Sequence, residues 1–296
     1  MPQISVIVPA FKPHDFISLH ESMAANAGVD AEWIVVDDGS GSNFDAVFST
    51  LPEGVRLLRQ KENCRQGAAR NAGLAVARGR WVKFLDADDK LDEGHLAALL
   101  AAAGQGRAIP FAATKHVFIG GGVLVNESWC DLPPDPDVQF RRLIVRPFLH
   151  HCGALFPRHL LTSLNGYDES LVTDEDGDLL LRILRSGYHF IPVEGVHYLY
   201  IHHQAESRVS ADNDIKKMQA RIRVCEKVVN GFAEQLPVEV AEALAQRMDK
   251  VAMNYWTAFP SEAQALLAQA RRLAPGYRPE GLYRRLKGRP KGGAQG

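Results

Sequence analysis

The first 85 residues alternate between short apolar runs and segments compatible with helix, and this alternation limits the fold more than any other feature of the chain. The runs cover residues 4–8, 33–36, 55–58 and 81–85, and the helical segments between them cover residues 15–27, 44–51 and 67–78. Runs that are β-branched and apolar at successive positions are typical of strands buried on both faces. The pattern therefore predicts a Rossmann-like α/β domain, with a mostly parallel central sheet flanked by helices.

The segments that follow the predicted strands are the ones expected to carry function. Right-handed crossovers bring the carboxyl ends of parallel strands to one edge of the sheet, where ligands of such folds bind. Residues 9–11, 37–40 and 86–89 each follow a predicted strand. We expect these three segments to converge in space although they are far apart in sequence.

The composition and charge exclude several classes of protein. The chain has 296 residues, of which 46% are hydrophobic and 23% charged, so disorder throughout and fibrous repeats are excluded. The formal net charge of −1 argues against a general polyelectrolyte binder of nucleic acid. Residues 271–296 nevertheless hold eight Lys and Arg and one Glu. This basic tail favours either peripheral contact with an anionic membrane surface or a solvated terminus.

Further features indicate a cytoplasmic location. No unbroken apolar run of about 18 residues occurs, so no transmembrane helix is expected. The chain begins with a strand pattern and lacks the basic segment of a signal peptide. Its cysteines are far apart and form no CxxC, which favours reduced thiols over disulfides or a zinc site. We expect a cytoplasmic protein, with peripheral contact at the inner face of the membrane as one option.

The pattern changes at about residue 212. Apolar residues then recur at helical spacing, and Pro237 and Pro260 interrupt them, which predicts a small C-terminal helical region. Glycines and prolines after residue 275 argue against another long packed helix. The expected domains are an α/β domain over 1–210, a helical region over 211–275 and a basic mobile tail over 276–296.

Two acids follow the fourth predicted strand. On an extended segment residues i and i+2 share a face, so we expect the carboxylates of Asp86 and Asp88 to point the same way. Paired carboxylates suit a hard cation such as Mg²⁺ or Mn²⁺ that also binds substrate phosphates. The alternative is that these acids cap the next helix.

Two further segments at the same edge suit a nucleotide. Asp38 follows the second strand, where an acid can accept hydrogen bonds from a nucleobase or ribose. A tight turn over residues 37–40 is the alternative interpretation. The helix that opens at Gly67 offers its amino end and the Arg70 guanidinium to an anionic diphosphate. This helix follows the third strand and lacks GxGxxG, which argues against an NAD dehydrogenase.

Five motifs in order resemble the family 2 glycosyltransferases of the GT-A fold, and the resemblance covers about residues 3–210. They are SVIVPAF at 5–11, VVDDGS at 35–40, QGAARNAG at 66–73, FLDADD at 84–89 and DEDGDLLLR at 174–182. One departure is Gly177, where the family often has an aromatic residue. The C-terminal helices lie outside the resemblance.

The resemblance implies a role for each matching position. Pro9, Ala10 and Phe11 would line the nucleobase pocket, and Asp38 would bond the base edge. Asp86 would contact the ribose or the metal shell, Asp88 would ligate a Mn²⁺ or Mg²⁺ ion on the diphosphate, and Asp176 would be the general base. Uracil is the expected base, although nothing in these residues distinguishes it from thymine, cytosine or guanine.

The implied reaction is transfer of a sugar from a nucleotide-diphosphate sugar to an acceptor hydroxyl with inversion. The acceptor would be a growing cell-surface glycan or a lipid-linked glycan. The metal would offset charge on the departing diphosphate, and one carboxylate would take the acceptor proton. The alternatives are a nucleotidyltransferase, which would need a Gly-rich basic loop after the first strand, and a non-catalytic nucleotide-sugar-binding scaffold.

Four acids crowd into residues 174–178, and only one can face the acceptor. Asp178 lies one helical turn before Arg182, which predicts an ion pair within the helix. Asp174 lies four positions before Asp178 and would share a face with it if the stretch is helical. Glu175 is expected nearer the acceptor or the helix amino end, where it would bind rather than deprotonate. Asp176 therefore remains as the base, in agreement with the resemblance. The adjacent histidines 150–151 and 202–203 are expected to be structural or surface residues, because adjacent pairs chelate poorly. A role of His202 or His203 at the metal or diphosphate is the alternative.

Overall fold

The computed structural model describes residues 1–104, 106–118, 122–126, 133–146, 149–202, 214–232 and 235–278. The chain divides into two compact units, one within 1–140 and 147–208 and the other within 141–146 and 209–296. The basic tail beyond residue 278, His203 and most of the glycine run at 120–122 lie outside the described residues.

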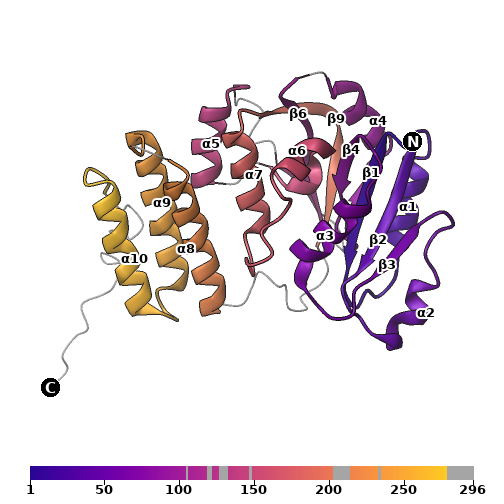
Figure 1. Cartoon of the computed structure of the whole chain (residues 1–296), viewed down its shortest axis with the longest axis horizontal. Coiled ribbons are helices and arrows are strands. Elements are labelled where there is room, and N and C mark those ends of the chain that lie inside the picture. The colour runs from indigo at the N-terminus through magenta and orange to yellow at the C-terminus, as the bar shows by residue number, and fades with distance from the viewer. Residues whose placement is uncertain are drawn as a thin grey trace. The chain divides into compact units, whose positions relative to one another are not determined.

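The central sheet of the first unit has the strand order β3-β2-β1-β4-β8. The first four strands are parallel, as predicted, and β8 is antiparallel to β4. Figure 1 shows this sheet with helices around it, which confirms the predicted α/β class. The strands are β1 (Ile4–Ala10), β2 (Ala31–Asp37), β3 (Arg56–Arg59), β4 (Trp81–Phe84) and β8 (Phe156–Pro157).

The helices of the first unit connect these strands in the expected alternation. The segment at 44–51 is helical for a shorter stretch than predicted, since it forms only a 3-10 turn and a four-residue helix. The helical elements are α1 (Ile17–Ala25), η1 (Ser42–Phe44), α2 (Asp45–Phe48), α3 (Arg65–Val76), α4 (His95–Ala102), η2 (His151–Gly153), α6 (Arg158–Ser163) and α7 (Glu175–Arg185). Helix α5 (Pro136–Val145) is divided between the two units after Phe140.

The core of this unit lies between β1 and its neighbours. Every residue of β1 is buried, as the unbroken apolar run predicts for a strand covered on both faces. Helix α3 packs on β1 and β2, and it approaches closely because Gly73 has no side chain. A Cβ at Gly73 would lie 2.4 Å from Cγ2 of Ile7. This close packing fixes the position of α3, which carries Arg70.

A second sheet has the strand order β5-β9-β6-β7. Its strands are β5 (Lys90–Leu91), β6 (Ala108–Phe118), β7 (Val123–Asn126) and β9 (His189–His202). Strands β6 and β9 run parallel with a register shift between Ala112 and Ala113, where β9 carries Gly195 with φ of +81°. The sequence did not predict this sheet, because its long strands are irregular and pair across large separations in the chain.

Helix α7 begins at Glu175, so Glu175, Asp176 and Asp178 lie in its first turn. Acids there interact favourably with the helix dipole. Nε of Arg182 lies 2.8 Å from Oδ2 of Asp178, which confirms the predicted ion pair. Asp178 is buried, and Asp176, two positions earlier, lies on a different side of the helix.

The second unit is helical. Its helices α8 (Ile215–Asn230), α9 (Val238–Tyr255) and α10 (Pro260–Leu273) lie side by side in Figure 1. Their apolar faces bury residues such as Met218, Leu244 and Leu266. The end of α5 belongs to this unit, because Nζ of Lys250 donates to the carbonyl of Val145 at 2.8 Å. None of the described helices is long and apolar enough to span a bilayer.

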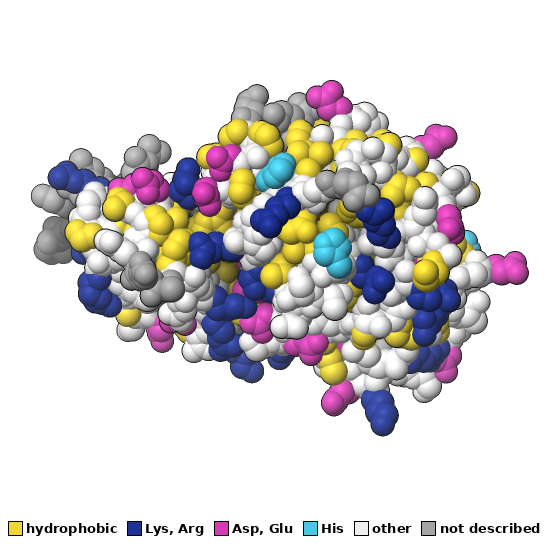
Figure 2. All heavy atoms as spheres, turned by 45° about the horizontal axis from the view of Figure 1, so that its top comes forward, with side chains coloured by type: hydrophobic (Ala, Val, Ile, Leu, Met, Phe, Trp, Pro, Cys, Tyr) yellow, Lys and Arg dark blue, Asp and Glu magenta, His cyan; other side chains and the backbone are white. Residues whose placement is uncertain are grey.

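Charged side chains are mixed on the molecular surface. In Figure 2, Lys and Arg side chains are interspersed with acidic, apolar and uncharged ones on the face shown. This distribution agrees with the nearly balanced counts of 34 basic and 35 acidic residues.

Candidate active site

The ends of β1 and β2 meet at one edge of the central sheet. The backbone N–H of Asp38 donates to the carbonyl of Ala10 at 2.8 Å, and the N–H of Lys12 donates to Oγ of Ser40 at 2.7 Å. The N–H of Leu85, just after β4, donates to the carbonyl of Ile7 at 3.1 Å. The three segments expected to converge are therefore neighbours in space.

Residues 9–11 offer both buried and exposed apolar surface at this edge. Pro9 and Ala10 are buried at the end of β1, whereas the Phe11 side chain is 46% exposed. Nζ of Lys12 lies 5.0 Å from the centre of the Phe11 ring, which is a cation–π distance. An exposed aromatic ring beside a cation suits stacking of a base and attraction of a phosphate.

Asp37 and Asp38 have different surroundings. Oδ1 of Asp37 accepts from the N–H of Ser40 at 2.9 Å, so the tight-turn interpretation applies to Asp37. Oδ1 of Asp38 accepts from the N–H of Cys64 at 2.7 Å, which ties this turn to the loop before α3. Burial raises the pKa of Asp38, and the Asp37 charge adds to this, while the N–H groups of Cys64 and Arg65 oppose it.

Asp86 and Asp88 lie in a turn, which corrects the expected extended geometry. The N–H of Asp89 donates to the carbonyl of Asp86 at 3.1 Å, so the chain reverses here and the shared-face argument does not apply. Asp88 is exposed, and the Asp86 side chain is 21% exposed. Asp89 is buried and anchors the turn to β9, since its Oδ1 accepts from the N–H of Ile201 at 2.8 Å.

Arg70 is buried between two acids from distant parts of the chain. Its side chain is 1% exposed, with Nη2 2.8 Å from Oδ1 of Asp86 and Nη1 3.2 Å from Oε1 of Glu175. Burial raises the pKa of Asp86, but the nearby charges, of which Arg70 is the largest, and the Arg70 hydrogen bond together outweigh burial and lower the pKa to about 2. Asp86 is therefore ionised. The guanidinium that sequence analysis assigned to the diphosphate lies against these carboxylates instead.

Asp176 and Glu175 are neighbours at the start of α7 but differ in access. The Asp176 side chain is 39% exposed, and the Glu175 side chain is 15% exposed and paired with Arg70. The N–H of Gly177 donates to Oδ1 of Asp176 at 2.8 Å. A Cβ at Gly177 would lie 2.7 Å from Oδ1 of Asp174, so a larger residue would push Asp174 aside.

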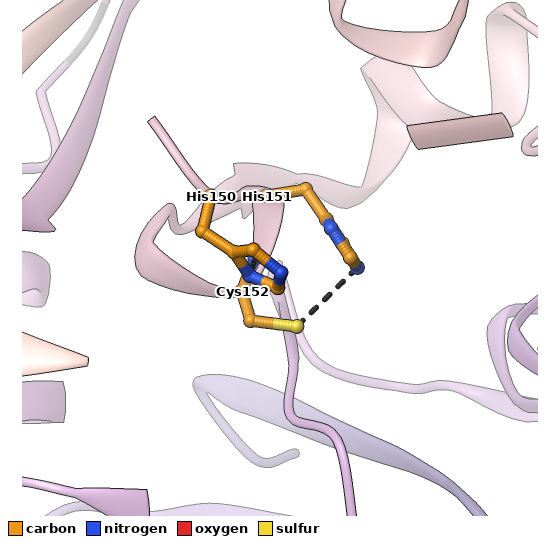
Figure 3. A group of neighbouring side chains, drawn as sticks. All are labelled: His150, His151 and Cys152. Atoms are coloured by element: carbon orange, nitrogen blue, oxygen red, sulfur yellow. Dashed lines mark hydrogen bonds between the residues drawn. The ribbon is translucent and has the colours of Figure 1, made fainter. Parts of the chain in front are cut away.

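Figure 3 shows a cluster of His150, His151 and Cys152. His151 of this cluster lies beside Asp176. Nε2 of His151 lies 3.3 Å from Sγ of Cys152, and Nδ1 of His151 lies 3.6 Å from Oδ2 of Asp176. His151 is 2% exposed, so it is no surface residue. Sequence reasoning did not assign His151 or Cys152 to the site, although the cysteine directly after the histidine pair was a visible signal.

The other histidine pair is only partly described. Nε2 of His202 lies 2.8 Å from Nδ1 of His116, and the His202 ring stacks on Phe118 with 4.1 Å between ring centres. These contacts agree with a structural role for His202. His203 lies outside the described residues.

Two groups at this edge have atoms that ligate metals. Asp86 and Asp88 provide carboxylate oxygens, which suit Mg²⁺ or Mn²⁺. His150, His151 and Cys152 provide softer atoms, all within 4.8 Å of one another. Burial raises the pKa of the Cys152 thiol well above its usual value, so the thiolate that a metal would need is disfavoured.

Comparison with known proteins defines the class of this chain. The profile described as "Glycosyl transferase family 2" matches residues 5–164, which is more than half of the chain. The chain belongs to this family and is a glycosyltransferase.

Two relatives act in the synthesis of bacterial glycans, according to their names. The succinoglycan biosynthesis protein ExoO of Rhizobium meliloti (strain 1021) is 29% identical over 259 residues, which cover 84% of this chain and 72% of that protein. The GalNAc(5)-diNAcBac-PP-undecaprenol beta-1,3-glucosyltransferase of Campylobacter jejuni is 29% identical over 174 residues, which cover 54% of this chain and 53% of that enzyme.

Solved glycosyltransferase structures share the fold. TarS 1–349 of S. aureus in complex with UDP-GlcNAc aligns with a TM-score of 0.67 at 19% identity, covering 90% of this chain and 79% of that one. The mannosyltransferase PcManGT of Pyrobaculum calidifontis, in complex with GDP-Man and Mn²⁺, aligns with a TM-score of 0.55 at 19% identity, covering 97% and 84%. These likenesses confirm the GT-A fold.

Proposed function

We propose that this glycosyltransferase moves a sugar from a nucleoside diphosphate sugar, with UDP as the expected carrier, to an acceptor hydroxyl with inversion in a single displacement. The observation that carries the proposal is the pairing of Arg70 with both Asp86 and Glu175. This pairing joins the turn after β4, expected at the donor diphosphate, to the start of α7, where Asp176 faces solvent. Donor and acceptor chemistry would then occur within one site.

The donor would bind along the edge formed by β1 and β2. Pro9 and Ala10 would form the floor of the base pocket, Phe11 would stack on the base, and Asp38 would bond its edge. A carboxylate with a raised pKa accepts a hydrogen bond readily at neutral pH. The complexes of TarS with UDP-GlcNAc and of PcManGT with GDP-Man support a nucleotide-sugar donor but leave the base open.

Asp88 and Asp86 would hold Mg²⁺ or Mn²⁺. The donor set fits a hard cation, because Asp88 is exposed in a turn and Asp86 is ionised. When bound, the cation would offset the negative charge that grows on the leaving diphosphate. Arg70 would hold Asp86 in place from the protein side. The Mn²⁺ named in the PcManGT complex supports this assignment.

Asp176 would be the general base that takes the proton of the acceptor hydroxyl. It is the more accessible of the two acids, at 39% exposed against 15% for Glu175. Glu175 is bound to Arg70, so its oxygens are less available to an acceptor. Inversion in a single displacement needs only one base. No covalent intermediate forms, so no second carboxylate is needed as a nucleophile.

The acceptor would be a growing cell-surface glycan or a lipid-linked glycan. The name of the Campylobacter relative, which includes undecaprenol, supports a lipid-linked acceptor. The eight Lys and Arg of residues 271–296, at the end of α10 and in the basic tail, would favour contact with the anionic inner face of the membrane.

Two measurements test the proposal. Thermal shifts with UDP, GDP, CDP and dTDP, with and without Mn²⁺, should show stabilisation by one base that depends on the metal. In transfer assays, Asp176→Asn should lower kcat at least about 100-fold, in line with general-base contributions. Its donor dissociation constant should stay nearly unchanged. Asp45→Asn is the matched control, because Asp45 is 55% exposed and lies on α2.

Other outcomes would redirect the proposal. Normal turnover by Asp176→Asn together with an inactive Glu175→Gln would assign the base to Glu175. Full activity of both variants would contradict the mechanism. Release of pyrophosphate from a nucleoside triphosphate would indicate a nucleotidyltransferase. Nucleotide binding with neither sugar transfer nor slow hydrolysis of the donor would indicate a scaffold.

A further inference from the structure

The segment that carries His151 is held rigidly in the core. Nζ of the buried Lys83 donates to the carbonyl of Cys152 and lies 2.8 Å from Nε2 of His95. A Cβ at Gly153 would lie 2.7 Å from the carbonyl oxygen of Ala112, so the segment also packs closely on β6. The backbone of η2 therefore fixes where the His151 ring can lie.

The neighbouring thiol decides which nitrogen of His151 carries a proton. Cys152 is 0% exposed, and burial raises the pKa of its thiol well above the usual value, so the sulfur keeps its hydrogen. Its Sγ lies 3.3 Å from Nε2 of His151 (Figure 3). An S–H group donates to an unprotonated ring nitrogen. In a neutral His151 ring the proton then resides on Nδ1.

Nδ1 of His151 needs an acceptor, and Asp176 is the nearest carboxylate. Among the described residues this buried nitrogen has no hydrogen-bond partner. Oδ2 of Asp176 lies 3.6 Å away, slightly longer than a hydrogen bond. A buried N–H without a partner is unfavourable, because nothing compensates for the water that it loses on burial. Hydrogen bonds of catalytic groups are often long without substrate and shorten in the complex.

We infer that His151 is a positioning residue for Asp176, with Nδ1–H donating to Oδ2 and with Cys152 holding the ring in this tautomer. The inference rests on the proposed function of Asp176 as the base. The N–H of Gly177 already holds Oδ1 at 2.8 Å, so a second donor at Oδ2 fixes the plane of the carboxylate. Each oxygen keeps another lone pair for the acceptor proton.

The contacts that run from Cys152 through His151 to Asp176 resemble a catalytic triad in which the histidine and the carboxylate have exchanged roles. In the Ser-His-Asp triad a carboxylate fixes the tautomer and orientation of a histidine. Here a thiol fixes the tautomer of a histidine, and the histidine orients a carboxylate. Because Nδ1 keeps its proton in this hydrogen bond, His151 aligns Asp176 without taking away the negative charge that a base needs. Correct alignment of a catalytic group contributes substantially to the rate.

The first experiment compares two substitutions of His151 in the full-length chain. Asn places an N–H near the position of Nδ1, whereas Leu has a similar size and no donor. We expect His151→Leu to lower kcat at least about 10-fold with donor KM within about two-fold of wild type, because only alignment of the base is lost. His151→Asn should recover kcat to within about three-fold of wild type. His159→Leu and His159→Asn are matched controls, because His159 is exposed on α6.

The second experiment observes the tautomer directly and needs no variant of His151 to be active. Long-range ¹H–¹⁵N correlation spectra of ¹⁵N-histidine-labelled protein should show His151 protonated at Nδ1, with the signal assigned by its loss in His151→Asn. Cys152→Ser keeps a donor, so it should preserve this tautomer and the wild-type kcat. Cys152→Val keeps an apolar side chain without a donor, so it should shift the tautomer and lower kcat.

The results that overturn the inference differ from those that overturn the proposed function. A His151 signal protonated at Nε2 in wild type overturns it, even if His151→Leu fails to fold. A folded His151→Leu variant with kcat within about two-fold of wild type also overturns the inference. If Asp176→Asn is inactive in the same assay, the proposed function still holds. Equal losses of kcat in His151→Asn and His151→Leu would contradict the inference and show that His151 contributes only packing. Full activity of Asp176→Asn would instead contradict the proposed function, in which Asp176 is the base.

Discussion

Arg70 and Asp86 form a buried ion pair, with 2.8 Å between Nη2 and Oδ1, and the same guanidinium lies 3.2 Å from Oε1 of Glu175. The pair joins α3 to the turn after β4 and to the start of α7. Removing a charge from water is costly, so Arg70 is tolerated at 1% exposure because its acids offset that cost. Arg70 thereby acts on the site through the acids it holds in place.

We expect Arg70→Met to lower the free energy of unfolding by about 3–5 kcal/mol, because it leaves Asp86 and Glu175 without their partner. Urea denaturation followed by circular dichroism measures this loss. Arg59→Met is the matched control, since Arg59 pairs with Asp45 on the surface and should contribute less than about 1 kcal/mol. Equal stability of Arg70→Met and wild type would show that water or other side chains satisfy the two acids.

Asp88→Asn should keep the fold and lose metal-dependent nucleotide binding. Asp88 is exposed in a turn, so loss of its charge should leave the melting temperature close to that of wild type. Loss of one ionised carboxylate should weaken the Mn²⁺-dependent affinity for UDP at least about 10-fold. Isothermal titration calorimetry with and without Mn²⁺ measures it. Asp30→Asn, at an exposed aspartate before β2, should bind normally. Unchanged Mn²⁺-dependent affinity in Asp88→Asn would remove Asp88 from the metal site.

Local sequence patterns predict the central sheet but not the second one. Strands β1 to β4 are short and separated by helices, and β1, β2 and β4 are mostly buried, so a few consecutive apolar residues are enough to predict each strand. Strand β9 contains Pro192 and Gly195, which normally interrupt a strand, and it pairs with β6 some 80 residues earlier in the chain. Pairing over such a separation depends on tertiary context, which a local pattern does not contain.

The sequence likewise predicts only part of the candidate site. Convergence of the strand ends follows from topology, so the segments after β1, β2 and β4 were predicted as neighbours. Arg70 and Glu175 are 105 positions apart in the sequence, and His151 and Asp176 are 25 positions apart. Whether such residues touch depends on side-chain packing in the folded protein, which a local pattern does not contain. The turn at Asp86 was mistaken for extended chain because spacing alone cannot distinguish the two.

Gly39→Ala should destabilise the protein much more than an alanine at another loop glycine. Gly39 has φ of +73°, and a Cβ there would lie 2.4 Å from the backbone carbon of Glu62. The conformational cost of about 1–2 kcal/mol therefore adds to a clash with backbone that cannot rotate away. Gly28→Ala is the matched control, because a Cβ at Gly28 meets nothing within 4 Å.

The expected loss for Gly39→Ala is at least about 3 kcal/mol in urea denaturation, against less than about 1 kcal/mol for Gly28→Ala. Nucleotide binding should also weaken, since the loop at Glu62 leads to Cys64, whose N–H holds Asp38. If both variants are equally stable, the turn at Gly39 can move away from residue 62 at little cost.

The buried amine of Lys83 makes the stability of the protein depend on pH. Nδ1 of His95 donates to the carbonyl of His197 at 2.9 Å, so Nε2 is left to accept from the Lys83 amine. Burial lowers the pKa of Lys83 to about 7, and burial followed by the Lys83 charge keeps the pKa of His95 well below 6.5. Both groups are therefore held in their neutral forms above about pH 7.

The sign of the effect follows from proton counts. Between about pH 7 and the unfolded lysine pKa of about 10.4, the unfolded chain carries a proton on Lys83 that the folded protein lacks. The unfolded state therefore binds more protons, and stability rises with pH by up to about 1.4 kcal/mol per unit from this group. Lys83→Met should remove that slope between pH 7.5 and about 9.5, as measured by urea denaturation at each pH. Lys61→Met, at an exposed lysine, should keep the wild-type slope. A slope in Lys83→Met equal to that of wild type would mean that Lys83 stays charged in the folded protein.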